Sequence, residues 1–265
     1  MQTIKDMFNN QKYVLFKDVL SPEICDLATN YMLIKKEAGL LEPPVSMGGN
    51  DSQCPKSYSI YGDPLFDTIL ARLAPQISSL VGINLVPAYT YARVYQNGEV
   101  LEWHKDRPSC EYSGTITLGK AANEPIWPIY VGKDDNDTTG KRLDVDIGEM
   151  MFYQGCEVPH WRNEYKGDWQ CQVFVHYVNA EGPYAQDCAL DGRKALGLLK
   201  TPENMRNSNV QQAQHKLEQE DHTSHGFAFN QQQDQVEKPV YGFQQQNQQQ
   251  TKKELPYNFE FKVGQ

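Results

Sequence analysis

The chain has 265 residues, a formal net charge of −9 at pH 7 and a hydrophobic fraction of 39%. This length allows one sizeable domain with its own core, together with additional sequence. The acidic balance argues against non-specific nucleic-acid binding, whose affinity comes from lysine and arginine contacts with phosphates. The first ten residues contain no apolar stretch typical of a secretory signal, and no run of about 18 apolar residues predicts a membrane span. We therefore expect a cytoplasmic protein whose six widely spaced cysteines remain free thiols.

The first elements predicted along the chain are one strand and two helices. Residues 12–19, which contain valine, leucine and aromatic side chains, predict a strand. Ser21, followed by a proline, is a favourable N-cap and predicts a helix that ends near Lys36. Residues 40–56 contain Pro-Pro and Gly-Gly pairs and predict a loop. A second helix is predicted over residues 63–80, where leucine and isoleucine recur at every fourth position.

A series of short β-strands is predicted from residue 84 onward. Segments rich in valine, isoleucine, threonine and aromatic residues alternate there with turn residues, and Asn97 followed by glycine predicts a tight turn. The predicted strands are residues 84–96, 99–104, 112–118, 126–132, 143–146, 149–154, 157–162 and 169–178. Such a series is typical of a double-sheet jelly roll or a similar sandwich. We expect an α+β, mainly β fold with the N-terminal helices packed on one sheet.

The composition changes near residue 199. Residues 1–198 have the pattern of one globular domain, whereas residues 199–265 are polar and contain three runs of three glutamines. Few apolar side chains are available there to offset the entropy that is lost on ordering. We expect most of residues 203–255 to be disordered. The last stretch, residues 255–263, alternates apolar and polar side chains, and we expect a loose tail there in preference to a short strand or a docking peptide.

Three residues capable of binding a metal ion lie among the predicted strands. His104 and Asp106 stand two positions apart at the end of one strand, so their side chains point to the same face. His160 follows Asp106 by 54 positions (160 − 106) and can complete a set of three ligands across two sheets. Two imidazoles and one carboxylate on one side of an ion leave its other positions open, as in non-haem Fe(II) oxygenases. The H-x-D tripeptide by itself is common, and the alternative is a surface histidine beside a turn aspartate.

Longer segments around these residues resemble a known family. Residues 91–107, with a tyrosine-bearing strand, an Asn-Gly turn and then H-x-D, resemble the strand–turn–strand of prolyl 4-hydroxylase-like 2-oxoglutarate oxygenases. Residues 148–162 are similar to the family segment that leads to the distal histidine. Residues 13–25 are similar to the strand and helix that precede the family core. The resemblance covers roughly residues 10–180.

The resemblance implies a double-stranded β-helix with iron at its open mouth, bound by His104, Asp106 and His160. It implies Fe(II), 2-oxoglutarate and O₂ as cofactors, with ascorbate as a further candidate. The implied reaction is oxidative decarboxylation of 2-oxoglutarate to succinate and CO₂, followed by hydrogen abstraction from an unactivated C–H bond. Hydroxylation is expected because Asp106 is present, whereas halogenating relatives have a small residue at that position. Peptidyl proline is favoured as substrate by the resemblance alone.

The distal carboxylate of 2-oxoglutarate needs a cationic partner, because an unpaired buried charge is costly, and arginine suits it best. Relatives usually carry this cation on the strand after the distal histidine, where this chain reads Trp-Gln-Cys-Gln. We expect Arg162, which lies two positions after the distal histidine and on the same strand face, to take this role. Lys166, Arg93 and Arg107 are the alternatives. We also expect Arg107 to pair with an acid near the site, with Glu111 as the candidate.

Four further residues have expected roles near the site. Tyr91 and Tyr95 share one face of their strand, and tyrosines there in relatives donate hydrogen bonds to the cosubstrate; core packing is the alternative. Thr117 is a further candidate hydroxyl. His176 stands among apolar neighbours, and we expect a hydrogen-bonded core residue rather than a fourth metal ligand.

The substrate and the reaction class leave alternatives open. Peptidyl proline, a free amino acid, a nucleobase or a small metabolite would suit the same iron site, and the rim loops 40–56 and 133–142 are the expected determinants of the choice. A non-catalytic binding or structural module on the same fold is disfavoured because all three ligand residues are present. A hydrolytic metalloenzyme that uses metal-bound water is disfavoured because no helical H-E-x-x-H motif occurs.

Overall fold

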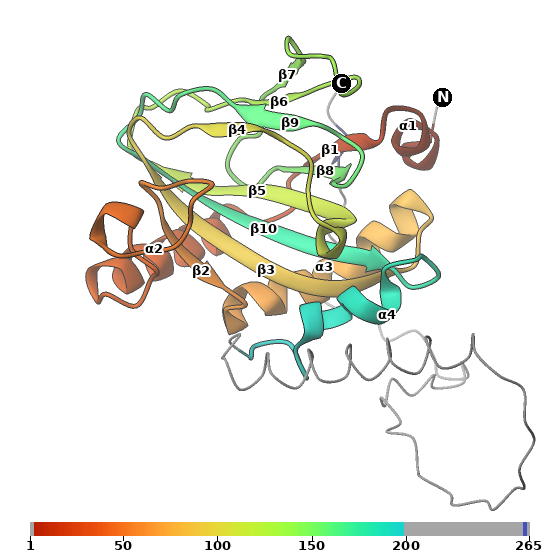
Figure 1. The fold of residues 1–265 in the computed structure, drawn as a ribbon, viewed down its shortest axis with the longest axis horizontal. Coiled ribbons are helices and arrows are strands. Elements are labelled where there is room, and N and C mark those ends of the chain that lie inside the picture. The colour runs from red at the N-terminus through yellow and green to blue at the C-terminus, as the bar shows by residue number, and fades with distance from the viewer. Residues whose placement is uncertain (1–2, 199–261, 264–265) are drawn as a thin grey trace, which may run out of the picture. The chain divides into compact units, whose positions relative to one another are not determined.

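The computed structural model describes residues 3–198 and 262–263, and two antiparallel β-sheets dominate this part of the chain (Figure 1). The larger sheet contains β1 (Tyr13–Lys17), β2 (Tyr58–Tyr61), β3 (Leu85–Gln96), β5 (Tyr112–Lys120), β8 (Met150–Gln154), β10 (Trp169–Asn179) and β11 (Lys262–Val263). The smaller sheet contains β4 (Leu101–His104), β6 (Ile129–Val131), β7 (Lys141–Leu143) and β9 (His160–Arg162). Their strand orders are β11-β1-β8-β5-β10-β3-β2 and β4-β9-β6-β7. The prediction of a mainly β fold with a jelly-roll core is confirmed.

Helices flank the larger sheet and begin where capping residues allow. They are α1 (Ile4–Gln11), α2 (Pro22–Glu37), α3 (Pro64–Val81) and the short α4 (Ala185–Cys188). The Ser21 hydroxyl caps α2 as predicted, and α3 runs from its N-cap Asp63 to Gly82, whose φ of 72° suits glycine. Helix α1 has no counterpart among the predicted helices, although Thr3 and Asp6 form a capping box. None of the helices in the described residues is long and apolar enough to cross a membrane.

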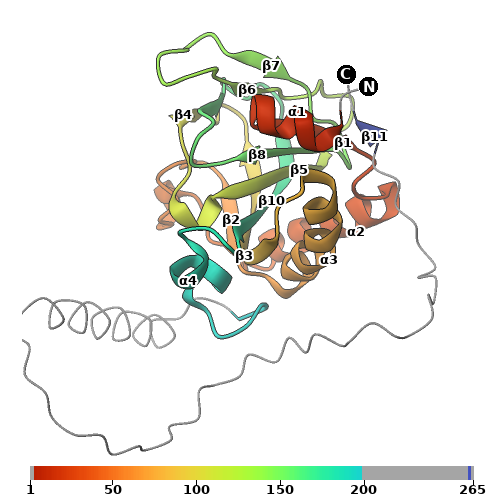
Figure 2. The same ribbon diagram turned by 90° about the vertical axis from the view of Figure 1, so that its right-hand side faces the viewer.

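Alternating side chains on the larger sheet build two separate cores. On β8, Met150 and Phe152 pack with the helices, whereas Met151 and Tyr153 pack with the smaller sheet. This follows from the two-residue period of a strand, which sends successive side chains to opposite faces. Figure 2 shows α2 and α3 on one side of the larger sheet and the smaller sheet on the other. Burying an apolar side chain of this size stabilises the fold by roughly 1.5–3 kcal/mol.

The same alternation on β10 directs one set of side chains to the helices and the other set to the inside of the jelly roll. Val173 and Val175 face the helices and belong to the larger core. Phe174 and His176 point the other way and line a pocket between the sheets. The helix-side core therefore supplies stability, while the opposite face of the same strand is available for polar side chains.

Three segments differ from their sequence-based predictions. Strand β7 occupies Lys141–Leu143, whereas a strand was expected over residues 143–146. Strand β2 lies where no strand was predicted; it is short, and it is recognisable mainly through its pairing with β3. In the predicted loose tail, Lys262–Val263 form β11 and pair with β1, which is the short-strand alternative. Residues 199–261 and 264–265 lie outside the described residues, so the expected disorder of the tail remains a prediction.

Candidate metal centre

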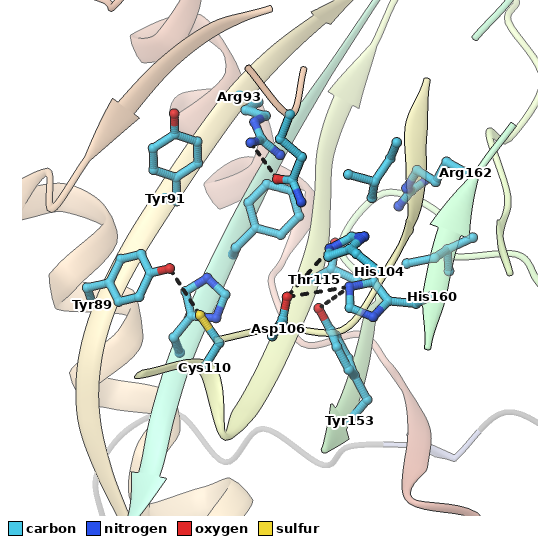
Figure 3. Close-up of a pocket in the computed structure, with 15 residues that line it drawn as sticks. Tyr89, Tyr91, Arg93, His104, Asp106, Cys110, Thr115, Tyr153, His160 and Arg162 are labelled. Atoms are coloured by element: carbon cyan, nitrogen blue, oxygen red, sulfur yellow. Dashed lines mark hydrogen bonds and ion pairs between the residues drawn. The ribbon is translucent and has the colours of Figure 1, made fainter. Parts of the chain in front are cut away.

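The three predicted ligand residues converge at one point between the sheets (Figure 3). His104 ends β4 and stands directly opposite His160, the first residue of β9, in the antiparallel register of the two strands. Asp106 follows β4 in the connecting loop. Its Oδ1 lies 3.6 Å from Nε2 of His104 and 3.7 Å from Nε2 of His160. Strand pairing thus brings together residues that are far apart in sequence.

Backbone hydrogen bonds orient both imidazoles. His104 Nδ1 lies 2.7 Å from the carbonyl oxygen of Glu102, and His160 Nδ1 lies 3.0 Å from that of Val158. A carbonyl can only accept, so each Nδ1 carries the proton and donates it. Each Nε2 then keeps its lone pair, which is the state that a metal ion requires. A hydrogen bond from the second ring nitrogen is also the usual support of a metal-binding histidine.

The protonation states suit a cation at this point. Burial lowers the pKa of His160 below its ordinary value, which favours the neutral imidazole. Burial alone would raise the pKa of Asp106, but the adjacent imidazoles of His160 and His104 hold that pKa well below its usual range. Ser113 donates a hydrogen bond of 3.0 Å to Asp106 Oδ2, which leaves Oδ1 facing the two Nε2 atoms.

Gly155 permits the close packing of the loop that carries Asp106. The Asp106 N–H donates to the Gly155 carbonyl at 2.9 Å. A Cβ atom at position 155 would lie 2.1 Å from the carbonyl oxygen of Cys110 and 2.5 Å from Asp106 Oδ2. Any larger residue would therefore displace the carboxylate from its position between the histidines.

A pocket of about 160 Å³ opens beside the three ligand atoms. A single bound water needs roughly 10–15 Å³ of such space, so the pocket can hold a small organic molecule. Side chains from both sheets and from the loop before β2 form its wall. They are Gln53, Tyr89, Tyr91, Arg93, Leu101, His104, Asp106, Cys110, Thr115, Ile129, Tyr153, His160, Arg162, Phe174 and His176.

Arg162 lines this pocket and forms no ion pair with an acid of the described residues. Its side chain is 1% exposed, its Nη1 donates to the carbonyl of Trp127, and its guanidinium lies 4.8 Å from the centre of the Trp127 ring. Its Nη2 is one of three buried side-chain polar atoms in the described residues that have no hydrogen-bond partner. Burial lowers the pKa of Arg162, although nearby tyrosines oppose this change. A buried guanidinium in this condition is suited to an anion that enters from outside the chain.

The other cations considered for the same role are placed differently. Arg93 lines the pocket but is paired with Asp51 through hydrogen bonds of 2.7 and 2.9 Å. Lys166 is exposed, pairs with Glu164 and is absent from the pocket wall, so the structure does not support it as a cosubstrate ligand.

Arg107 pairs with an acid as expected, but the candidate partner Glu111 is wrong. Its guanidinium binds Asp191 through hydrogen bonds of 2.8 and 3.0 Å. The predicted partner, Glu111, accepts a hydrogen bond from the backbone of Asn179 instead. The sequence separation of 84 residues between Arg107 and Asp191 explains why inspection of neighbouring acids missed the pair.

The two candidate tyrosines separate into one pocket residue and one core residue. Tyr91 lines the pocket, and its hydroxyl lies 3.0 Å from Asp51 Oδ2 and 2.8 Å from Ser59 Oγ. Tyr95 is fully buried against Trp127, which corresponds to the core-packing alternative.

The candidate hydroxyl of Thr117 is used elsewhere in the fold. It donates to the carbonyl of Val145, and Thr115, two residues earlier on the same strand face, lines the pocket instead. The buried Gln172 amide donates to Thr115 at 2.7 Å and accepts from Gln170 at 3.0 Å. These two neutral amides form a hydrogen bond with each other on β10. This is the strand on which relatives usually carry the cation that binds 2-oxoglutarate.

His176 is a buried, hydrogen-bonded histidine, as expected, but it also faces the pocket. Its Nδ1 lies 2.9 Å from Ser113 Oγ, and burial lowers its pKa to about 4. Together with Asp106 and Cys110 it forms a second group of atoms close enough to hold a metal ion.

Four residues beside the ligand atoms were not predicted from the sequence: Ser113, Cys110, Thr115 and Tyr153. The two-residue period of β5 and β8 could have indicated those of them that lie on strands. Alternate apolar residues of these strands pack against the helices, so the residues between them must face the smaller sheet and the pocket. Cys110 lies in a 3₁₀ turn, η2 (Pro108–Cys110), and no periodicity marks it.

Comparison with solved structures identifies the fold. The structure is similar to a prolyl-4-hydroxylase from Pseudomonas putida, with 16% identity, a TM-score of 0.53, and coverage of 66% of this chain and 97% of that one. It is similar to a Trichoplax adhaerens prolyl hydroxylase in complex with a hypoxia inducible factor peptide fragment, with 10% identity, a TM-score of 0.51, and coverage of 69% and 90%. It is also similar to SnoK, a non-haem α-ketoglutarate-dependent carbocyclase from nogalamycin biosynthesis, with 17% identity, a TM-score of 0.51, and coverage of 74% and 92%. No protein-family model and no curated protein matches the sequence.

These likenesses show that the chain has the fold of prolyl hydroxylases and other 2-oxoglutarate-dependent oxygenases, so the resemblance noted in the sequence is confirmed at the level of fold.

Proposed function

We propose that the protein is an Fe(II)- and 2-oxoglutarate-dependent oxygenase in which His104, Asp106 and His160 bind the iron. The observation that carries this proposal is the unpaired, buried amino group of Arg162 in the same pocket as the three converging ligand atoms. Two neutral imidazoles and a carboxylate are the donor set of non-haem Fe(II) oxygenases. A pocket that combines this donor set with a buried guanidinium suits an anion that also binds the metal.

The charge balance of the pocket favours a dicarboxylate. An Fe(II) ion, the Asp106 carboxylate and the Arg162 guanidinium together carry two net positive charges. The other arginines near the pocket, Arg93 and Arg107, are neutralised by acids of the chain itself. The dianion of 2-oxoglutarate has two negative charges at opposite ends, so it offsets the excess and avoids leaving a buried charge unpaired.

The residues of the chain divide the work of binding and orientation. Arg162 binds the distal carboxylate, and the neutral side chains of Leu101, Ile129 and Phe174 exclude water around it. Ser113 holds Asp106 by one oxygen so that the other stays directed at the metal position. The bound iron would supply the activation of O₂ that oxidative decarboxylation of the keto acid requires.

The finer assignments belong to the same proposal. Hydroxylation of an unactivated C–H bond is the expected outcome, since the carboxylate of Asp106 is present. A prolyl residue is the first substrate to test, since two proteins of similar fold are prolyl hydroxylases. Tyr91, which lines the pocket, is the tyrosine that we expect to contact a bound ligand. Ascorbate is a candidate reductant.

The first experiment is an anaerobic titration of the Fe(II)-loaded protein with 2-oxoglutarate, followed by visible absorption. Chelation of Fe(II) by the keto acid produces a weak charge-transfer band, which should appear in the wild type and vanish in His160→Ala. His215→Ala is the matched control and should keep the band. Absence of the band from protein with bound iron would reject 2-oxoglutarate as cosubstrate.

The second experiment measures turnover of 2-oxoglutarate to succinate in Asp106→Ala. Loss of a metal ligand should cost more than the roughly 100-fold that loss of a supporting hydrogen bond can cost. Succinate formation within tenfold of the wild-type rate would show that Asp106 is not a ligand. Proline-containing peptides added to the wild type then test substrate choice, since a substrate raises succinate formation and gains one oxygen atom.

A further inference from the structure

Tyr153 brings a fourth polar atom, its hydroxyl oxygen, to the point where the three ligand atoms meet. It belongs to β8, it is 2% exposed, and its hydroxyl oxygen lies 3.2 Å from Nε2 of His160 (Figure 3). The two rings meet edge to face at 62° with centres 4.7 Å apart, which fixes the direction of the phenol. The Ser113 hydroxyl and the Asp106 carboxylate also lie within hydrogen-bonding reach of this phenol.

The hydrogen bond between Tyr153 and His160 cannot survive metal binding. His160 donates its Nδ1 proton to Val158, so Nε2 has a single lone pair, which here accepts from the phenol. A metal ion that binds Nε2 takes that lone pair. The phenol then loses this acceptor, and the metal position competes with Ser113 and Asp106 for its oxygen.

The position of the phenol oxygen matches that of a neighbouring metal ligand. Protein nitrogen and oxygen ligands lie roughly 2.0–2.2 Å from such an ion. Two ligands at a right angle are then separated by about 3 Å, from the same bond lengths. The observed 3.2 Å between the Tyr153 oxygen and His160 Nε2 is close to that separation. A metal ion bound to His160 Nε2 would therefore lie within ligand distance of the phenol oxygen.

We propose that Tyr153 becomes the fourth protein ligand when the bound iron is Fe(III), an inference that rests on the iron site proposed above. A phenolate is a hard, anionic oxygen donor, which suits the more highly charged ferric ion. On oxidation, Fe(II) loses one electron to O₂; the phenol O–H bond breaks, an Fe–O bond forms, and the proton leaves to solvent.

The consequence of this ligand is a ferric form that resists reduction. An additional anionic ligand stabilises Fe(III) more than Fe(II), so Tyr153 lowers the reduction potential of the site. Protein oxidised without substrate would then remain ferric until a reductant restores Fe(II). Tyr153→Phe should therefore have a higher reduction potential than the wild type, while binding the same amount of iron.

The test uses the full-length protein, loaded anaerobically with one equivalent of Fe(II) and then exposed to air. The wild type should become coloured through phenolate-to-Fe(III) charge transfer, and excitation in that band should give the resonance Raman modes of a tyrosinate ring. The band should be lost in Tyr153→Phe at equal iron content. Tyr89→Phe is the matched control and should keep it, because the Tyr89 hydroxyl contacts Cys110 at 3.0 Å instead.

The outcomes separate this inference from the proposed function. Iron that binds in the wild type and not in His160→Ala, without a tyrosinate band, overturns the role of Tyr153 and leaves the iron site intact. A band that persists in Tyr153→Phe, or disappears in Tyr89→Phe, also overturns it. Failure of the wild type to bind iron overturns both proposals. Should Tyr153→Phe not fold, absence of tyrosinate Raman modes from the wild type still decides against the ligand.

Discussion

Two buried arginines face the same pocket from different sheets, and they differ in whether a carboxylate of the described residues neutralises their charge. Arg93, on β3 of the larger sheet, binds Asp51 in a pair whose side chains are both 7% exposed, and its Nη2 also donates to Gln53 at 2.8 Å. Arg162, on β9 of the smaller sheet, is buried more deeply and has no described carboxylate as partner. Both are inward residues of a strand that lines one cavity.

The difference separates a structural charge from a functional one. The charge of Arg93 is neutralised by Asp51. Because Asp51 belongs to the loop before β2, this ion pair holds that loop against the larger sheet. The charge of Arg162 is not cancelled, although burial of a lone guanidinium is costly. A fold that retains such a group gains from it only when an anion binds. The comparison therefore predicts opposite consequences for stability and for ligand binding.

The largest expected effect is on stability at the paired arginine. Arg93→Met keeps a long apolar side chain but leaves Asp51 buried and without its cation. Breaking a buried pair in this way costs about 3–5 kcal/mol, which urea unfolding at pH 7 measures directly. Adding Asp51→Asn should recover part of the loss. A loss below about 1 kcal/mol, the value of an exposed pair, would contradict the comparison.

The next effect is on ligand binding at the unpaired arginine. Arg162→Met should leave the free energy of unfolding unchanged or raise it, because it removes an uncompensated charge. The same change should weaken 2-oxoglutarate binding by about 2–5 kcal/mol, or roughly 30-fold or more in Kd. Anaerobic calorimetry on the iron-loaded protein measures the Kd. Lys166→Met, at an exposed lysine, is the control and should bind normally.

A third effect concerns the neutral histidine on the larger-sheet wall. The pKa of His176 is lowered by burial from 6.5 to about 4, so in this range the unfolded chain takes up a proton that the folded protein does not. The unfolding free energy of metal-free protein should therefore fall as pH falls from about 6.5 toward 4, by up to about 3 kcal/mol from this residue. Urea titrations between pH 7 and 4.5 should show a flatter profile for His176→Gln. Parallel profiles for the two proteins would show that His176 is not held neutral by burial.

The smallest expected effect is on metal affinity. It distinguishes a residue that hydrogen-bonds to a metal ligand from a residue that does not. Ser113→Ala removes the hydrogen bond to Asp106 and should weaken metal binding by about 10–100-fold, as loss of such support usually does. Thr117→Val lies on the same strand face but loses only a bond to Val145. Its metal affinity should match the wild type. Competition with a coloured chelator measures both affinities, and equal values for the two variants would remove Ser113 from the site.

The sequence was informative wherever a local rule decides the structure. The cap at Ser21 and the two-residue spacing of His104 and Asp106 are local, and both features appear as predicted. Arg162 could be placed inside because it shares a strand face with His160.

Contacts set by long-range packing were beyond such rules. Asp191 reaches Arg107 across 84 residues, from a turn, η3 (Ala189–Gly192), that has no periodic signal. Lys166, only a few positions beyond Arg162, leaves the strand and turns to solvent. The phenol of Tyr153 meets His160 only because β8 and β9 belong to facing sheets.

The spacing of His160 and Arg162 on β9 has a consequence for how the site tolerates change. One three-residue strand carries both the metal ligand and the anion partner, and its register against β4 places both. A one-residue insertion or deletion at residues 158–160 would turn both side chains to the outer face at once. The loop 133–140 can lengthen or shorten freely so long as β6 still pairs with β9. We therefore expect changes in length to be tolerated at the rim and not on β9, where the metal site and the anion site are kept or lost together.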